Sequence, residues 1–174
     1  MTIRKILTEP DPFLRKKSQS VEKVDDSIRK VMDDMLETMY EAPGIGLAAI
    51  QIGIPKRIIV LDISKDPEKK EPMYFINPEK VYTSKDQATY EEGCLSVPGQ
   101  FAEIDRPEKC HIKYLDYNGD SKELKAEGLL ATCIQHEMDH LEGILFIDYL
   151  SKLKRSMITK KLSKQKKELE RIVV

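Results

Sequence analysis

The chain has 174 residues, of which 34% are charged, and a formal net charge of −1 at pH 7. That length suffices for a domain with a real core, and the balanced charge gives no general affinity for polyanions. Its three cysteines (Cys94, Cys110 and Cys133) are an odd number, so no disulfide framework is expected. Without a signal-peptide pattern or an apolar run of membrane-spanning length, we expect a cytoplasmic protein with no membrane attachment.

The first half of the chain predicts one helix followed by strands. Residues 25–40 have apolar side chains at helical spacing, and Asp25 or Asp26 can cap the start. Residues 42–55, rich in Gly and Pro, predict a loop with a short extended piece. The β-branched segment 57–63 predicts a strand, and strands broken by turns are expected over 73–84 and 87–99.

The second half predicts a hairpin and two helices. Asn118-Gly119 is typical of a hairpin turn between two strands. Residues 128–143 predict a buried helix that stops at Gly143, and a charged helix follows at about 151–172. We therefore expect a single α+β domain over residues 1–174, in which antiparallel strands pack around one buried helix, with an N-terminal helix and a C-terminal helix.

The predicted buried helix contains a His-Glu-x-x-His motif made of His136, Glu137 and His140. Two histidines four residues apart lie on one helix face and can bind one metal ion. Glu137 is then placed to act as a general base toward a water molecule at that ion. The alternative is a pair of ordinary core histidines, which the intervening glutamate makes the weaker interpretation.

Two histidines do not complete a catalytic metal site, and the residues after His140 offer no good third ligand. Phe146 occupies the position where one class of metalloprotease has its last histidine. The upstream candidates are Cys94, Cys110 and His111. Cys94 is favoured because it lies beside a glycine at a predicted turn, where packing explains a cysteine poorly, and because a thiolate is a strong metal ligand. Two imidazoles and one thiolate leave a fourth position open, as in catalytic sites.

Three segments of the chain, "GIGLAAIQ" (44–51), "EGCLS" (92–96) and "QHEMDHLEG" (135–143), resemble the three motifs of peptide deformylases in order and spacing. The resemblance is to the bacterial type 1 class. Members of this family are metal-dependent hydrolases that remove the formyl group from the initiator methionine of nascent polypeptides. Two positions depart from the family pattern, Phe101 and Thr132, and both concern the side-chain pocket rather than the reaction.

The resemblance assigns roles position by position. Cys94, His136 and His140 would bind one divalent metal ion, natively Fe²⁺, with Zn²⁺, Ni²⁺ or Co²⁺ able to substitute. Glu137 would be the acid and base. The substrate oxygen would face Gln51 and the backbone N–H of Leu95, and the peptide would lie along Gly44, Ile45, Gly46 and Gly93. From the residues alone, Gln51 is also compatible with a turn contact, Ile45 and Leu95 with core packing, and Gly44 and Gly46 with an ordinary loop.

Residues 151–174 contain nine Lys or Arg and two acids, a local net charge of +7 against −8 for the first 150 residues. This charge predicts either a solvated helix face or docking to ribosomal RNA, and the resemblance favours the ribosome. We expect a monomer that acts on N-formylmethionyl peptides. Two other functions fit parts of the pattern: a zinc endopeptidase, which the missing downstream ligand disfavours, and a non-catalytic metal-stabilised binding module, which Glu137 disfavours.

Overall fold

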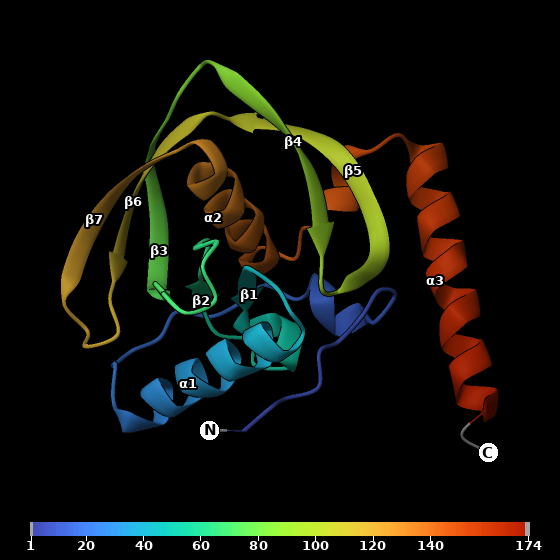
Figure 1. Ribbon diagram of the computed structural model, residues 1–174, viewed down its shortest axis with the longest axis horizontal. Helices are drawn as coiled ribbons and strands as arrows, with labels where there is room; N and C mark the ends of the chain where they lie inside the picture. The colour runs from blue at the N-terminus through green and yellow to red at the C-terminus, as the bar shows by residue number, and fades with distance from the viewer. Residues whose placement is uncertain (1, 173–174) are drawn as a thin grey trace.

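The computed structural model describes residues 2–172, and within them it has three α-helices and two antiparallel sheets (Figure 1). The larger sheet has the strand order β1-β2-β3-β6-β7 and the smaller is the hairpin β4-β5. The strands are β1 (Gly46–Ala48), β2 (Ile58–Leu61), β3 (Met73–Thr83), β4 (Gln87–Cys94), β5 (Val97–Pro107), β6 (Lys109–Leu115) and β7 (Ser121–Glu127). The α+β class is confirmed.

Helix α1 (Asp26–Glu41) begins where the sequence predicts, with Asp25 as its N-cap accepting a hydrogen bond from the backbone N–H of Ile28. Its apolar face, with Met32, Met35 and Met39 fully buried, packs against β1 and β2. Because this face covers one side of the larger sheet, the short strand β1 is held firmly in place.

Helix α2 (Gly128–Leu141) lies at the centre of the molecule, between the larger sheet and the β4-β5 hairpin (Figure 1). Every residue from Ala131 to Leu141 is buried, including the polar ones. Gly143 follows with φ of 74°, a conformation that favours glycine, and an added Cβ there would lie 2.4 Å from the carbonyl oxygen of Arg15. The close approach of the N-terminal segment therefore fixes where the buried helix ends.

Strand β5 is the element that the sequence did not predict at its full length of 11 residues. It pairs with β4 from Gln87↔Pro107 to Cys94↔Val97, so the tip of the hairpin carries Cys94. A register shift between Gly93 and Cys94 changes the direction of the strand at this point. The hairpin thus brings the 92–96 segment over the central helix.

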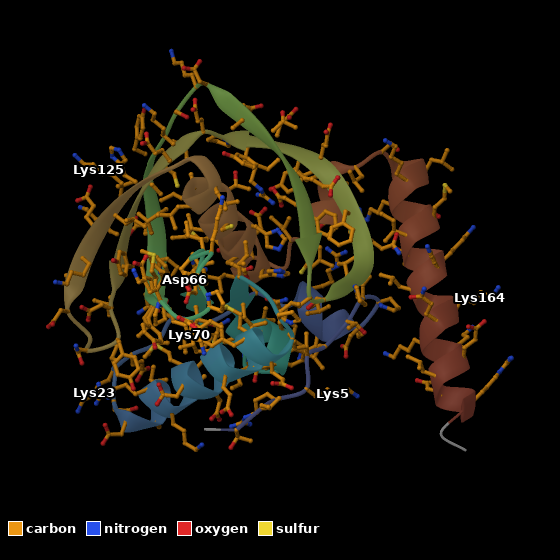
Figure 2. All side chains as sticks on the ribbon, viewed as in Figure 1. Lys5, Lys23, Asp66, Lys70, Lys125 and Lys164 are labelled. Carbon is orange, nitrogen blue, oxygen red and sulfur yellow. The ribbon has the colours of Figure 1, made fainter. Side chains whose placement is uncertain are left out.

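Helix α3 (Lys152–Ile172) runs along the outer side of the hairpin, on the side opposite the larger sheet (Figure 1). Leu162 is buried and, with Ile158, packs against a cluster that includes Val97, Ile104 and Phe146. Most of the remaining helix surface is exposed, and Lys164 points away from the body of the molecule (Figure 2).

Candidate metal centre

Cys94, His136 and His140 come together although 41 residues of chain separate the cysteine from the first histidine. One potential ligand atom from each of the three lies within 4.8 Å of the other two, and Cys94 Sγ is 3.3 Å from His140 Nε2. The two histidines share one face of α2, one turn apart, and the cysteine is supplied by the tip of the hairpin. The three predicted ligands therefore lie in one place.

The rival ligand candidates lie elsewhere. Cys110 is fully buried in the apolar cluster under the larger sheet, where burial raises the pKa of its thiol. The ring of His111 lies 4.6 Å from that of Tyr82 on the strand next to it. Both residues are accounted for by packing.

His136 is oriented by a buried ion-pair network. Its Nδ1 lies 2.8 Å from Glu92 Oε1, which directs Nε2 toward the centre of the site. Arg106 donates to both oxygens of Glu92, at 2.7 and 2.9 Å, and to Asp139 at 2.8 Å. Tyr149 donates its hydroxyl hydrogen to the same oxygen of Asp139 at 2.7 Å.

The network controls charge as well as position. Burial by itself raises the pKa of Glu92, but the hydrogen bonds from His136 and Arg106 outweigh it, so the pKa lies below its ordinary value. Glu92 is therefore held as a carboxylate. Sequence reasoning missed Glu92, Arg106 and Asp139 because charged residues are normally exposed; the one available signal was the position of Glu92 within the predicted motif.

Glu137 lies beside the three candidate ligands, with its Oε1 3.9 Å from His136 Nε2. Only 6% of its surface is exposed, and among the described residues its Oε2 has no hydrogen-bond partner. Burial raises the pKa of Glu137 to about 7. On the other side Gly46 approaches so closely that an added Cβ would lie 2.7 Å from Glu137 Oε1. The carboxyl group thus has room only because this residue is glycine.

Gln51 lies behind the cysteine. Its Nε2 is 3.6 Å from Cys94 Sγ and 2.9 Å from Ser96 Oγ, while its Oε1 accepts a hydrogen bond from the backbone N–H of Ala48. The same amide therefore makes the turn contact that the residue type alone predicts and also reaches the candidate ligand.

A pocket of about 580 Å³ opens onto these residues. It is lined by the predicted substrate residues Gly44, Ile45, Gly46, Gly93 and Leu95, together with Cys94, His136 and Glu137. Thr132 and Cys133 form part of its wall, and Phe101 and Leu129 lie at its exposed rim. Gly44 lets the Leu95 side chain pack against the opposite wall, since a Cβ there would lie 2.7 Å from Leu95 Cδ1.

The donor set fits a divalent transition metal. One sulfur and two imidazole nitrogens are borderline-soft ligands, suited to zinc, iron, cobalt or nickel. Three candidate donors, beside a buried Glu137 oxygen that has no hydrogen-bond partner among the described residues, are typical of a catalytic site rather than a closed structural one.

The family model described as Polypeptide deformylase matches residues 3–156. The chain belongs to this family. A peptide deformylase of Pelagibacter ubique is 68% identical over the whole of both chains, and one of Phenylobacterium zucineum is 60% identical over 96% of this chain and 99% of its own.

Solved deformylase structures agree with the fold throughout. The peptide deformylase of Ehrlichia chaffeensis in complex with actinonin has a TM-score of 0.91 at 47% identity, covering 95% of this chain and 98% of that one. A peptide deformylase from Legionella pneumophila has a TM-score of 0.90 at 48% identity, covering 98% and 99%.

The chain is therefore a metal-dependent enzyme of the deformylase family, whose members remove the N-formyl group from nascent polypeptides. The resemblance drawn from the three motifs is confirmed. As for the membrane, none of the helices in residues 2–172 is both long and apolar enough to cross a bilayer.

Proposed function

We propose that Cys94, His136 and His140 hold one divalent metal ion and that Glu137 moves the proton during deformylation of N-formylmethionyl peptides. The observation that carries this assignment is the approach of one cysteine sulfur and two imidazole nitrogens to within 4.8 Å of one another, beside a buried glutamate. In this chain the whole of residues 1–174 is proposed to act as one catalytic domain.

A divalent ion held by these three residues would supply Lewis acidity, lowering the pKa of a water molecule toward about 7. Glu137 accepts a proton from that water as its oxygen forms a bond to the formyl carbon. When the carbon–nitrogen bond breaks, Glu137 returns the proton to the leaving amine, so that formate and a free amino terminus result. Because the carboxylate first accepts a proton and then donates it, one residue serves as both base and acid.

Negative charge grows on the formyl oxygen as the bond to water forms. We assign the Gln51 side-chain amide and the backbone N–H of Leu95 as the donors that stabilise this charge. The support for Gln51 is the position of its Nε2, 3.6 Å from Cys94 Sγ. Removing one such donor costs about 3 kcal/mol of transition-state stabilisation in comparable enzymes.

The pocket walls suit an extended peptide that ends in methionine. Gly44, Gly46 and Gly93 line the pocket, and an extended peptide could lie along them and satisfy its backbone hydrogen bonds by strand addition. Ile45 and Leu95 supply apolar surface for the methionine side chain.

For the metal itself we propose Fe²⁺ as the native ion, with Zn²⁺, Ni²⁺ or Co²⁺ able to replace it. The mixed sulfur and nitrogen donor set is compatible with each of these ions. Elemental analysis of protein purified without air should find close to one iron per chain. One zinc per chain, with iron absent, would refute the choice of ion while leaving the ligand set intact.

We also propose that the enzyme works in the cytoplasm as a monomer and docks on ribosomal RNA through α3. The lysines Lys160, Lys161, Lys164 and Lys167 are all exposed on this helix. Their charge contrasts with the net −8 of the first 150 residues, so a polyanion would be drawn to this side of the molecule.

One assay on one anaerobic preparation tests the reaction. Formyl-Met-Ala-Ser, acetyl-Met-Ala-Ser and an unblocked longer peptide are incubated with the enzyme, and formate and new amino groups are measured. We expect equal amounts of formate and amine from the formylated peptide, and neither acetate release nor internal cleavage. Cleavage of internal peptide bonds would instead favour an endopeptidase, and no product from any peptide would reject both.

A further inference from the structure

Strand β1 is the edge strand of the larger sheet on the side of the catalytic pocket. It pairs with β2, and Gly46 lies opposite Leu61. Directly beyond the two strands, the backbone N–H of Asp62 donates to the carbonyl oxygen of Ile45 at 2.9 Å. Antiparallel strands alternate hydrogen-bonded and non-hydrogen-bonded pairs, so the N–H and C=O of Gly46 point away from β2. Since Gly44, Ile45 and Gly46 line the pocket, this free edge faces the place of the peptide backbone.

The free edge of β1 lies so close to its neighbours that small shifts matter. A Cβ added to Gly46 would lie 2.7 Å from Glu137 Oε1, and one added to Gly44 would lie 2.7 Å from Leu95 Cδ1. Functional groups must be held to within about 0.5 Å of their productive geometry. A strand of three residues does not fix itself to that tolerance, so the residues behind it must do so.

The carboxylate of Asp62 joins three segments behind this edge, and the side chain is buried. Its Oδ2 accepts hydrogen bonds from the hydroxyl of Tyr40, in the last turn of α1, and from the backbone N–H of Glu71 at 3.0 Å. Its Oδ1 accepts from the backbone N–H of Ser64 at 2.9 Å. Because the backbone N–H of the same residue holds the carbonyl of Ile45, the helix and the loop between β2 and β3 both determine where the free edge lies.

The bond between Tyr40 and Asp62 is charge-assisted. Burial raises the pKa of Asp62, but the hydrogen bonds from Tyr40 and Ser64 outweigh it, so the pKa lies below its ordinary value. Burial and the bond to Asp62 raise the pKa of Tyr40, so its hydroxyl keeps the proton that it donates. The ammonium group of Lys70 (Figure 2) lies 4.3 Å from the centre of the Tyr40 ring and holds the ring from the loop side.

We propose that Tyr40 and Asp62 are positioning residues that hold the free edge of β1 in place for pairing with the backbone of the formylated peptide. The inference rests on the deformylase function proposed above, because it concerns the substrate of that same site. Neither side chain lines the pocket, so both act through Ile45 and its neighbours. Backbone pairing is present in the bound substrate and in the transition state alike, so its loss raises KM and leaves kcat nearly unchanged.

Tyr40→Phe removes only the hydroxyl group and keeps the ring under Lys70. With formyl-Met-Ala-Ser we expect KM to rise about fivefold and kcat to stay within about twofold of its value in the unmodified enzyme. The inhibition constant of the product Met-Ala-Ser should rise by the same factor as KM, and metal content should not change. Asp62→Ala removes all three acceptor contacts and should raise KM further; if this variant does not fold, Tyr40→Phe still decides the question.

Tyr117→Phe is the matched control. Tyr117 is also half-buried, and its hydroxyl also donates to a carboxylate of α1, that of Asp33 at 3.1 Å. It lies in the turn between β6 and β7 and does not line the pocket. The control should lower Tm about as much as Tyr40→Phe and leave both KM and kcat unchanged. Thermal unfolding of the three proteins therefore separates a loss of stability from a loss of positioning.

Unchanged KM in Tyr40→Phe, whatever its Tm, would overturn the positioning role. A fall in kcat with KM unchanged would overturn it as well, since the edge would then act on the reaction rather than on binding. An equal rise of KM in Tyr117→Phe would show a general loss of stability and contradict the proposal. In each of these cases the unmodified enzyme still deformylates the peptide, so the proposed function stands. If the unmodified enzyme releases no formate, the proposed function fails and the positioning role fails with it.

Discussion

At the scale of single residues, the three cysteines differ in what surrounds them. Cys94 is partly exposed at the pocket, next to His140, whereas Cys110 is enclosed by apolar side chains. Cys133 lines the pocket from α2, where burial raises the pKa of its thiol to about 12 and keeps it protonated. Only Cys94 has both a ligand geometry and a route to the substrate.

These differences predict metal content. Cys94→Ala, His136→Ala and His140→Ala should each purify with little metal, because two remaining ligands cannot hold the ion tightly. Cys110→Ala, which removes a buried thiol of the core, should keep about the metal content of the unmodified chain. Elemental analysis of the four variants, purified together without air, is the measurement. Full occupancy in Cys94→Ala would refute its assignment as a ligand.

Some features of the candidate site could be predicted from single residues in the sequence, and others could not. The spacing of His136, Glu137 and His140 predicts a shared helix face, because the helical repeat alone determines it. The glycine beside Cys94 indicates a turn, but only the folded hairpin brings that turn to the helix. Arg106 could not be predicted as buried, since its burial depends on Glu92 and Asp139, which lie 14 and 33 residues away.

At the scale of elements, Arg106 connects the hairpin to the central helix. It donates to Glu92 on β4 and to Asp139 on α2, and all three are buried. Arg106→Ala should reduce the free energy of unfolding by about 3–5 kcal/mol, because two buried carboxylates lose their partner. Chemical denaturation at one fixed metal concentration measures the change.

The matched control for Arg106 is an exposed ion pair. Lys109 lies 3.8 Å from Glu127 on the neighbouring strand, with both side chains mostly in solvent. Lys109→Ala should change the free energy of unfolding by less than about 1 kcal/mol. If both variants lose the same small amount, the buried network does not hold the hairpin on the helix.

Asp34 attaches the N-terminal segment to α1 and should make stability depend on pH. It is fully buried and accepts hydrogen bonds from the backbone N–H of Thr2 at 2.8 Å and from Arg4 at 2.9 Å. Burial raises the pKa of Asp34, but the bonds from Arg4 and Thr2 outweigh it, so the folded pKa lies below the ordinary value. The carboxylate therefore stabilises the fold above about pH 4 and stops doing so as pH falls through its folded pKa.

The variant Asp34→Asn isolates this contribution. Thermal unfolding of the two proteins should show a large difference in Tm at pH 7. The difference should shrink as pH falls below about 4 and through the lowered folded pKa of Asp34, because the carboxyl group of the unmodified protein then becomes protonated. A difference in Tm that does not change with pH would contradict the assignment of the effect to the ionised carboxylate.

Strand β5 shows why the element boundaries were only partly predictable. Glu103 and Asp105 are exposed on either side of the buried Ile104, but the next inward position holds Arg106, whose charge breaks the alternation of apolar and polar side chains that identifies a strand. Its pairing with β4 stabilises the extended conformation, which the local sequence pattern alone does not predict. By contrast, α1 was predictable because its cap and its apolar face are both local features.

At the scale of the whole molecule, positive charge is concentrated on α3, away from the pocket. Leu162 and Ile158 anchor the helix, and its lysines remain in solvent (Figure 2). The position of α3 against the hairpin was not predictable from its sequence, because a few apolar residues in a charged helix do not identify their partner. Its distance from the pocket predicts separate effects on ribosome binding and on catalysis.

Reversing four lysines of α3 to glutamate tests this separation. Ribosome binding should weaken strongly and lose much of its salt dependence, whereas turnover of a free formylated tripeptide should barely change. The reversed residues are Lys160, Lys161, Lys164 and Lys167. Co-sedimentation with ribosomes across a salt series, beside a peptide assay on the same samples, measures both effects.

A second set of reversals controls for net charge alone. Lysines that are exposed elsewhere on the surface are reversed to give the same total charge: Lys65, Lys85, Lys122 and Lys125. These changes should weaken ribosome binding much less than the changes in α3. If the two sets of reversals have equal effects on ribosome binding, or if neither has an effect, α3 is an ordinary solvated helix and not a ribosome-binding element.

Glu137 lies beside the three proposed metal ligands and is not itself proposed as a ligand, so one variant separates binding of the ion from the proton transfer. Glu137→Ala should keep the metal content and thermal stability of the unmodified enzyme, since Cys94, His136 and His140 remain in place. Its turnover of formyl-Met-Ala-Ser should fall about 10³-fold, the size of effect expected when a general acid–base group is removed. Metal content and formate release are measured on one anaerobic sample of each protein. A fully metal-loaded Glu137→Ala protein with near-normal turnover would contradict the role assigned to Glu137.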